Sequence, residues 1–224
     1  NENVIQSKED IASIRICPSR DNVDIWLNFS VDEPTDWRRT SGCTGGLTTT
    51  APHSTTTIFH DGPILFPTTI NKLAKNLFES QTLHRQVGGV HASALSDGTK
   101  LLYIAEDIGR HNTLDKIAGY ILLEEPQMAQ RILLTTGRIS SEMLQKSVRI
   151  GAPILISRTS PTTMSVELAH RYGVTLIGYA RQTSFKVYTH LERIKQGLES
   201  VHTPELSARF HINSPSQDKD VSWQ

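Results

Sequence analysis

The chain has 224 residues, of which 37% are hydrophobic and 21% charged, and its 23 basic residues balance its 23 acidic ones. A chain of this length buries roughly 70% of the surface that it exposes when unfolded, so it needs neither disulfides nor a metal to fold. The neutral charge balance argues against a dedicated nucleic-acid coat and against a polybasic membrane binder. The two cysteines, Cys17 and Cys43, are too few for a disulfide framework or a cysteine-rich zinc site. Because the apolar runs are too short to cross a bilayer and no secretory signal region opens the chain, we expect a soluble, cytoplasmic protein.

The N-terminal segment alternates between apolar and polar positions. Ile14 and Ile16 precede the polar residues 18–22, and Val23 and Ile25 follow them. A period of two on both sides of a polar stretch predicts two short strands joined by a turn.

Residues 35–57 have neither the strand period nor the helix period, and they are rich in Gly, Ser and Thr. A loop of this length is functional or disordered in most compact domains. It contains Cys43, which follows Arg38 and Arg39, and exposure beside positive charge favours the nucleophilic thiolate. The alternative is an idle loop cysteine, which is the commoner case for a lone cysteine. Cys17, at the end of the first predicted strand, is expected to be a small buried hydrophobe.

Strands and helices alternate from residue 58 onward. The predicted elements are a helix over 70–83, strands over 87–95 and 101–105 around an Asp-Gly turn, a helix capped by Asn112, a strand over 131–135, a helix capped by Ser140 or Ser141, a strand over 154–157, a helix capped by Ser160, a strand over 174–179 and a helix over 191–201. This alternation indicates parallel strands with right-handed crossovers, and therefore the α/β class.

An arginine follows the carboxyl end of each of four successive predicted strands: Arg110, Arg138, Arg158 and Arg181. Ligands of open α/β sheets bind beyond these ends, and parallel strands bring them to one edge. Serine-capped helix N-termini follow two of the strands and also attract phosphate. The pattern predicts a polyanion site suited to a nucleotide or a pyrophosphate. The alternative is that the four are ordinary solvated loop arginines.

Two histidines lie near the same strand ends. His91 resembles the first residue of the zinc-deaminase motif, but the acid that this motif needs is replaced by Ser93 and no cysteine pair follows. Deamination is therefore disfavoured, and a satisfied, partly buried histidine is the more ordinary interpretation. His111, directly after Arg110, is a turn histidine unless the arginine site is real, in which case it contacts the ligand.

Several sequence blocks occur together and in a fixed order. They are GGVHASAL at 88–95, EDIGRHNTLDK at 106–116, TGRISSEM at 136–143, SRTSPT at 157–162, and YAR at 179–181 with VYT at 187–189. Jointly they resemble the FdhD/NarQ family, the accessory sulfurtransferases of formate dehydrogenase. The resemblance implies a cytidine-deaminase-like, three-layer α/β fold with a mixed, mainly parallel central sheet. It also implies that the deaminase zinc site is absent and that the protein is a homodimer.

The resemblance also implies a function. Such proteins accept persulfide sulfur from a cysteine desulfurase and pass it to a molybdenum or tungsten bis-molybdopterin guanine dinucleotide, which then goes to apo-formate dehydrogenase. The phosphates of this cargo would suit an arginine-lined edge, and no nucleic acid or membrane insertion is expected. The alternative is a cofactor-binding chaperone without covalent sulfur chemistry. A zinc-free nucleotide-processing enzyme with His91 or His111 as base ranks last.

The family's persulfide cysteine falls on Cys43, and the second cysteine that many members carry is Gly46 here. One sulfur acceptor suffices for a persulfide, whereas a mechanism that uses a cysteine pair does not fit this chain. The family's cofactor-binding segment falls on Tyr179, Ala180, Arg181, Gln182, Thr183 and Ser184. The matching blocks also contain Arg110, His111, Arg138 and Arg158, whose cofactor role we infer from their places at the strand ends.

Four segments are therefore expected. They are N-terminal strands over 1–34, with a further family stretch before Asn1, a mobile cysteine-bearing loop over 35–57, an α/β cofactor-binding core over 58–194 and a C-terminal extension over 195–224.

Overall fold

The computed structural model describes residues 5–20, 22–31, 57–181 and 183–195 and, for 37–39 and 47–49, the backbone alone. Its elements are η1 Lys8–Asp10, β1 Ile11–Ile16, β2 Val23–Leu27, β3 Trp37–Arg39, β4 Leu47–Thr49, α1 Pro67–Glu79, α2 Thr82–Val87, β5 His91–Ser96, β6 Leu101–Asp107, α3 Arg110–Glu124, β7 Ile132–Thr135, α4 Ser141–Arg149, β8 Ile154–Ser157, α5 Thr163–Tyr172, β9 Thr175–Gly178, β10 Lys186–Val187 and η2 Leu191–Arg193. Within these ranges, no helix combines the length and the apolar character that crossing a membrane requires.

The centre of the molecule is a six-stranded sheet with the order β10-β9-β8-β7-β5-β6. Strands β7, β8 and β9 pair in parallel, and the other neighbours pair antiparallel. Strands β6, β7, β8 and β9 therefore run in one direction, and β5 and β10 run in the other. The predicted α/β class with a mixed sheet is confirmed, and the cytidine-deaminase-like assignment stays a prediction.

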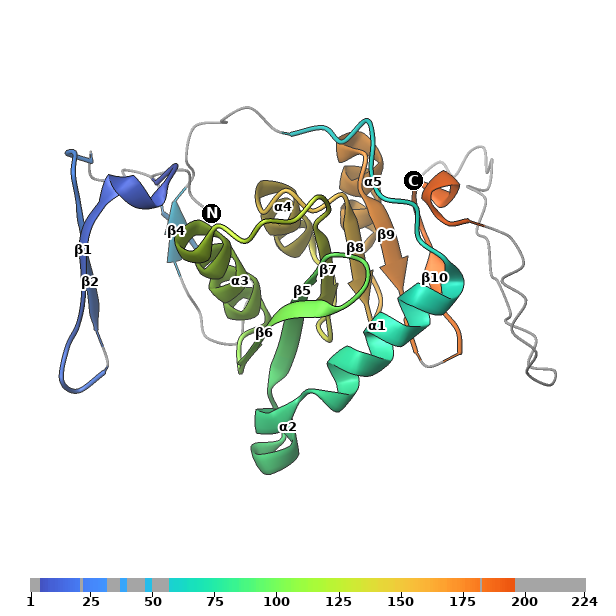
Figure 1. Cartoon of the computed structure of the whole chain (residues 1–224), viewed down its shortest axis with the longest axis horizontal. Coiled ribbons are helices and arrows are strands. Elements are labelled where there is room, and N and C mark those ends of the chain that lie inside the picture. The colour runs from blue at the N-terminus through green and yellow to red at the C-terminus, as the bar shows by residue number, and fades with distance from the viewer. Residues whose placement is uncertain are drawn as a thin grey trace, which may run out of the picture.

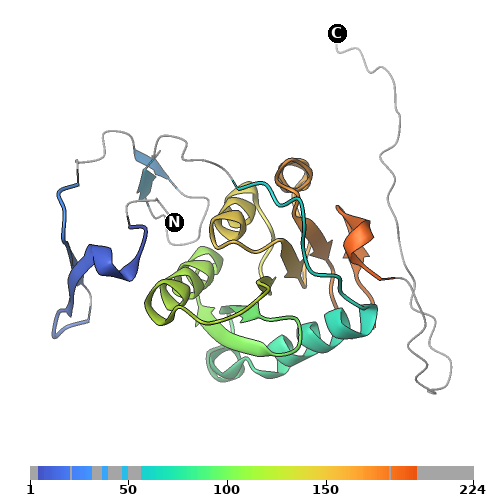
Figure 2. The ribbon, with the colours of Figure 1, turned by 45° about the horizontal axis from the view of Figure 1, so that its top comes forward.

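Helices cover both faces of this sheet, which gives three layers (Figures 1 and 2). Successive side chains of a strand point to opposite faces. Leu133 and Leu155 accordingly pack in the cluster under α3, α4 and α5, whereas Leu134 and Ile156 pack in the cluster under α1. The continuous apolar runs of the central strands are the consequence of this burial on two sides.

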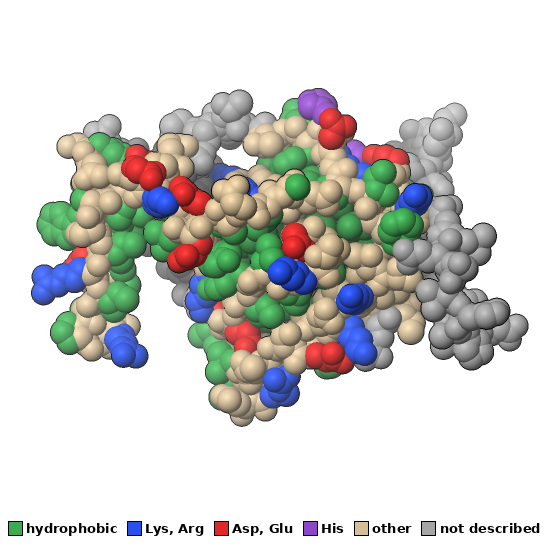
Figure 3. All heavy atoms as spheres, in the orientation of Figure 1, with side chains coloured by type: hydrophobic (Ala, Val, Ile, Leu, Met, Phe, Trp, Pro, Cys, Tyr) green, Lys and Arg blue, Asp and Glu red, His purple; other side chains and the backbone are tan. Residues whose placement is uncertain are grey.

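The N-terminal hairpin of β1 and β2 projects from the sheet body (Figure 1). Its register pairs Ile14 with Ile25 and Ile16 with Val23, so these four share one face. They are between 46% and 62% exposed, and Figure 3 shows apolar side chains spread over the hairpin. The hairpin prediction is confirmed, but the hairpin is not covered by the body of the molecule.

Cys17 is half-buried in the hairpin turn, and its Sγ accepts a hydrogen bond from the Asn22 amide at 3.1 Å. The expectation of a buried hydrophobe was wrong, because neither buried apolar cluster of the described residues includes the projecting hairpin. The structure also places the paired strands β3 and β4 inside 35–57, where irregular chain was expected. The β-branched threonines of β4 and the tryptophan of β3 favour strand despite the missing period.

The predicted helix over 70–83 is two helices, α1 and α2. The Glu106 carboxylate accepts hydrogen bonds from the first backbone amides of α2, at Thr82, Leu83 and His84. This acid lies on β6, so the cap that separates the helices comes from a distant part of the chain. Strand β5 begins only at His91, because two glycines at 88 and 89 have φ values of +64° and +62°.

The start of α3 also differs from the prediction. It begins at Arg110 after Gly109 rather than after Asn112. The reason is Asp107, whose Oδ1 accepts both the Gly109 amide at 2.9 Å and the Asn112 side-chain amide at 3.0 Å. Asn112 is thereby drawn back against the strand end instead of capping the helix.

Of the two predicted serine caps, one is confirmed. The Ser140 hydroxyl accepts a hydrogen bond from the Met143 amide at the start of α4. Helix α5 is capped by Thr162 instead of Ser160. The Ser160 carbonyl pairs with the Ile139 amide at 3.2 Å, which holds Ser160 in the preceding loop.

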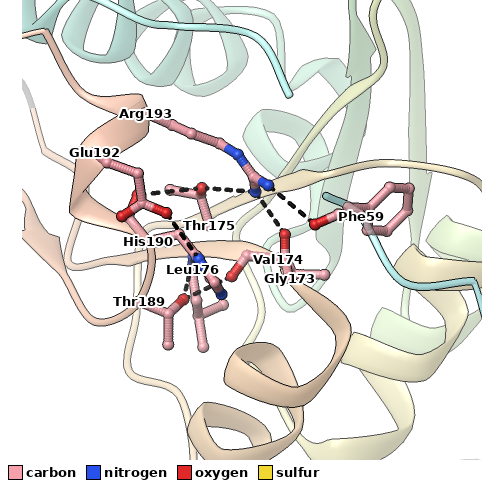
Figure 4. A network of polar contacts seen from close by, with 9 residues as sticks. All are labelled: Phe59, Gly173, Val174, Thr175, Leu176, Thr189, His190, Glu192 and Arg193. Carbon is pink, nitrogen blue, oxygen red and sulfur yellow. Dashed lines mark hydrogen bonds and ion pairs between the residues drawn. The ribbon is translucent and has the colours of Figure 1, made fainter. Parts of the chain in front are cut away.

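A buried arginine ties the two ends of the core together (Figure 4). Arg193 is 6% exposed, and its guanidinium donates to the carbonyls of Gly173 and Phe59 and to the Thr175 hydroxyl. The α5–β9 turn is tight here: Gly173 has a φ of +68°, and a Cβ added to it would lie 2.0 Å from the Phe59 oxygen. Arg193 belongs to a single 3₁₀ turn, where a longer helix over 191–201 was predicted, and residues 196–201 lie outside the described part of the chain.

Replacing Arg193 should destabilise the fold. In Arg193→Met the buried carbonyls of Gly173 and Phe59 lose a charged donor, and we expect the free energy of unfolding to fall by about 2–4 kcal/mol. The matched control is Arg171→Met, at an exposed position on α5. Urea denaturation measures both variants, and equal losses for the two would contradict this role of Arg193.

Candidate functional site

The predicted cationic residues lie in loops that follow the strand ends at one edge of the central sheet. The carboxyl ends of β6, β7, β8 and β9 lie at this edge because the four strands run in the same direction. The chain leaves these ends into loops that carry Arg110, Arg138, Arg158 and Arg181, as the sequence predicts. We call this edge, with these four residues, the arginine edge. In the sheet order β6 is separated from β7 by β5, so the row is not continuous along neighbouring strands.

Strand β5 reaches the arginine edge from the opposite direction. Its first residue, His91, lies across from Asp107 in the antiparallel register. Beyond the end of β7, the Thr136 amide donates to the Ala92 carbonyl at 2.9 Å, and the Ala92 amide donates to the Thr136 hydroxyl at 3.0 Å. These two bonds hold residues 136–138 alongside the start of β5.

A glycine lets two side chains converge beside this contact. A Cβ added to Gly137 would lie 3.0 Å from Cβ and 3.3 Å from Cδ of Arg110, and 3.6 Å from Nδ1 of His91. The Arg110 side chain and the His91 ring therefore pack over the same backbone position. Gly137 has no left-handed φ, so the close approach is what requires glycine here.

Hydrogen bonds among buried hydroxyl groups hold the loop at Gly137 in place. Ser93 Oγ lies 2.6 Å from Thr113 Oγ1 on α3 and 2.9 Å from Thr135 Oγ1 on β7, and all three residues are buried. Thr135 Oγ1 also accepts the Gly137 amide at 3.2 Å, and the Ser157 hydroxyl donates to the Gly137 carbonyl at 2.7 Å. The loop that carries Arg138 is thus fixed from two neighbouring strands.

An apolar pocket opens at the same edge between α1 and the ends of β7 and β8. It is a small hollow lined by Ala74, Leu77, Phe78, Leu134, Thr135, Thr136, Ile156, Arg158 and Ala180. The Arg158 guanidinium lies 4.1 Å from the centre of the Phe78 ring, a cation–π contact. One wall of the pocket is therefore both cationic and aromatic.

The segment after β9 bends sharply at the edge. Tyr179 is exposed and has a φ of +51°, while its amide donates to the Thr159 carbonyl at 3.0 Å. Ala180 is buried and donates to the Ser157 carbonyl at 2.9 Å, and the Arg181 amide donates to the Ser184 carbonyl at 2.8 Å. Thr183 and Ser184 are exposed.

Two predicted site residues, Cys43 and Gln182, lie outside the described residues. The structure therefore brings together the arginines, the 179–184 turn and the pocket, and the place of the thiol stays a prediction.

His111 faces the neighbouring helix. It is buried, and its Nε2 lies 3.5 Å from the Glu142 carboxylate at the start of α4. Burial and the positive charge of Arg110 lower the pKa of His111, against the opposing effect of Glu142. Within the described part of the chain, neither ring nitrogen has a hydrogen-bond partner. His111 thus packs against α4, and its contact with a ligand at the edge stays a prediction.

The pKa of His91 is also lowered, first by burial and then by the positive charges of Arg110 and Arg138. Its ring is therefore neutral at ordinary pH. The sequence interpretation as a partly buried histidine agrees with its half-buried state, but it missed the two arginines beside the ring.

Gly137 and Phe78 were missed by the sequence interpretation. A Gly-Arg pair directly after a strand was the available signal for the first, and no local pattern separates Phe78 from an ordinary residue of an amphipathic helix. In the described ranges no three His, Cys, Asp or Glu side chains are grouped to hold a metal ion.

The fold and the site define a three-layer α/β protein with a cationic ligand edge. The model of the FdhD/NarQ family matches residues 1–195, and the chain belongs to this family. A sulfur carrier protein FdhD from Bacillus licheniformis is 42% identical over 135 residues, which cover 60% of this chain and 51% of the relative. One from Staphylococcus haemolyticus is 33% identical over 208 residues, which cover 87% of this chain and 76% of the relative.

A solved structure shares the fold. The crystal structure of a protein described as a formate dehydrogenase accessory protein, from Desulfotalea psychrophila, matches with a TM-score of 0.67 and 29% identity, over 87% of this chain and 75% of that one. The chain spans about half the length of several curated relatives that it matches.

The buried histidines should make stability depend on pH. Because the pKa of His111 is lower in the folded chain, the unfolded chain binds more protons below its own pKa of about 6.5, and stability falls as pH falls through that value. We expect His111→Gln to reduce this slope between pH 7.5 and 5.5 by up to about 1.4 kcal/mol per pH unit. The slope is measured by urea denaturation at several pH values.

The control for this prediction is His60→Gln, at an exposed position. An unchanged slope in His111→Gln would show that His111 does not bind its proton more weakly in the folded state.

Proposed function

We propose that this protein is a sulfur carrier of formate dehydrogenase maturation. It accepts sulfur as a persulfide on Cys43 and transfers it to a bis-molybdopterin guanine dinucleotide cofactor of molybdenum or tungsten, bound as cargo at the arginine edge. The observation that carries the proposal is the family membership, together with curated relatives named sulfur carrier protein FdhD. The cationic edge and its pocket support the cargo part.

The loading step is a thiol exchange. The Cys43 thiolate attacks the terminal sulfur of the desulfurase persulfide, a new S–S bond forms on Cys43, and the desulfurase cysteine leaves as a thiolate. Release of that sulfur as sulfide takes two electrons. Because Gly46 stands where many members have a second cysteine, we assign these electrons to two external thiols: the first attacks the inner sulfur of Cys43 and sulfide leaves, and the second releases the Cys43 thiol from the mixed disulfide, so that the two external thiols end as a disulfide.

The described residues fit the chemistry of the cargo. Guanidinium groups bind phosphate oxygens in a bidentate manner, and four of them follow strand ends at one edge. The pocket beside Arg158 and Phe78 offers an apolar and aromatic wall to a purine ring. The turn at 179–184, on which the family's cofactor-binding segment falls, borders the same pocket through Ala180.

The partners of this function are a cysteine desulfurase as sulfur donor and apo-formate dehydrogenase as the recipient of the sulfurated cofactor. We place the reaction in the cytoplasm and propose a homodimer. Light scattering of the purified chain measures the oligomeric state directly.

The second candidate is a chaperone that binds and delivers the cofactor without covalent sulfur chemistry. The arginine edge serves both functions equally, so the geometry of the edge does not distinguish them. The two differ in whether Cys43 ever carries sulfur.

Replacement of Cys43 separates the two functions. After incubation with a cysteine desulfurase and free cysteine, we expect wild type and Cys17→Ser to gain one sulfur atom and Cys43→Ser to gain none, as measured by intact mass. Cys43→Ser should also fail to activate formate dehydrogenase while it unfolds at the same temperature as wild type. Activation of formate dehydrogenase by Cys43→Ser would contradict the sulfur-carrier function and would favour the chaperone function.

Replacement of the edge arginines tests the cargo site. Loss of one charged hydrogen bond costs about 1.5–3 kcal/mol, so Arg138→Gln and Arg158→Gln should each weaken binding of guanosine diphosphate roughly 10- to 100-fold. Isothermal titration calorimetry measures the affinity, and Arg171→Gln on the surface of α5 is the control. An affinity that stays unchanged in both variants places the nucleotide elsewhere.

A further inference from the structure

His91 has a place at the arginine edge that the proposed function does not use. Its ring packs with the Arg110 side chain over Gly137, and the two bonds between Ala92 and Thr136 fix this arrangement. The next residue of the loop is Arg138, whose charge also acts on the ring. The Arg110 side chain therefore packs beside one titratable ring, and a second permanent cation, Arg138, follows Gly137 in the same loop and acts on the ring.

The acidic residues nearest in sequence to this point are directed elsewhere. Asp107, across from His91, binds Lys116 with Oδ2 at 2.7 Å and the Gly109 amide with Oδ1. Glu106, the neighbour of Asp107 on β6, binds the amides that open α2.

On the α2 side, the group that faces His91 is His84, whose Nδ1 lies 3.2 Å from the Val90 carbonyl. The charged and titratable groups of the described chain that act on His91 are thus Arg110, Arg138 and His84, and all of them disfavour the protonated ring.

We propose that Arg110, Arg138 and His91 form an oxyanion site in which His91 takes up a proton when the anion binds. The ligand class is a tetrahedral oxyanion group with a total charge of −2, and in the cell it is the pyrophosphate of the nucleotide cargo, which carries one negative charge on each phosphoryl group. The inference rests on the proposed cargo function. It adds His91 to the two arginines as a third residue that binds the anion, and the contribution of His91 depends on its proton. Arg110 and Arg138 attract the anion at any pH, and His91 makes its binding tighter as pH falls.

The physical reason is that a bound dianion changes the sign of the electrostatic field at the His91 ring. The two guanidinium charges oppose protonation of a ring placed beside them. A dianion between them outweighs their effect on the ring and adds a hydrogen-bond acceptor for the imidazolium. Binding and protonation are therefore linked, and each strengthens the other.

The test follows the His91 ring by NMR in the full-length protein. Sulfate is the first probe because it keeps its −2 charge between pH 5 and 8, so any pH dependence belongs to the protein. We expect the midpoint of the His91 titration to rise by about one pH unit in sulfate relative to sodium chloride of equal ionic strength. His91→Gln assigns the signal.

Guanosine diphosphate and guanosine distinguish the sources of the effect. A rise with sulfate and with the diphosphate supports a general oxyanion site, and a rise with the diphosphate alone supports a site that needs the nucleotide. A midpoint that moves with neither probe overturns the proposal. An equal rise with uncharged guanosine also overturns it, because the base and not the anion would then be responsible.

A pair of glycine variants tests the geometry. In Gly137→Ala the new methyl group lies 3.0 Å from Arg110 Cβ and 3.6 Å from His91 Nδ1, so the packing of the two side chains must change. We expect this variant to lose the anion-dependent rise and, because Arg110 Cβ is fixed by the α3 backbone, to unfold at a somewhat lower temperature while it remains folded at 25 °C. The control is Gly119→Ala on α3, where an added Cβ meets nothing within 4 Å. A full rise in Gly137→Ala would contradict the role of Arg110 beside His91.

The sulfur-carrier function is measured in the same samples by the mass gain on Cys43. Sulfur loading without an anion effect on His91 overturns the oxyanion site alone. An anion effect without sulfur loading overturns the carrier function and leaves the oxyanion site standing.

Discussion

Burial of the central strands on both faces is the constraint on which the rest of the molecule depends. The central positions of strands β7, β8 and β9 are apolar, and adjacent residues such as Leu133 and Leu134 pack into opposite clusters. A shift of one residue would exchange the two clusters, so the register is strongly determined. The register in turn fixes where each strand ends, and therefore where each arginine loop begins.

The same arrangement places four arginines after strand ends at one edge of the sheet. Glu106 and Asp107 lie at the end of β6, yet their carboxylates cap α2 and hold the start of α3. Both carboxylates accept hydrogen bonds from backbone amides near the edge. Guanidinium groups that follow neighbouring strand ends make a positive potential at this edge, which is the basis of the anion site that we propose.

Much of the fold could be predicted from local patterns. Alternation around residues 18–22 predicted the β1–β2 hairpin, and the strand-helix rhythm after residue 100 predicted the class and the edge to which the arginines belong. Errors arose where a distant residue controlled a local choice. Asp107 drew Asn112 away from the cap of α3, and Cys17 is half-buried in a hairpin that belongs to neither buried cluster of the described residues.

The sequence by itself determined the layered α/β class, the family and the cationic residues after the strands, because periodicity and motif order are local properties. Only the tertiary structure decided which of these residues meet. His91 and Arg110 are brought together by antiparallel β5 and by a glycine at 137 that leaves room for both, and Phe78 meets Arg158 because α1 crosses the ends of β7 and β8. Such contacts depend on chain direction and on backbone clearance between distant segments, and neither quantity is encoded in a local pattern.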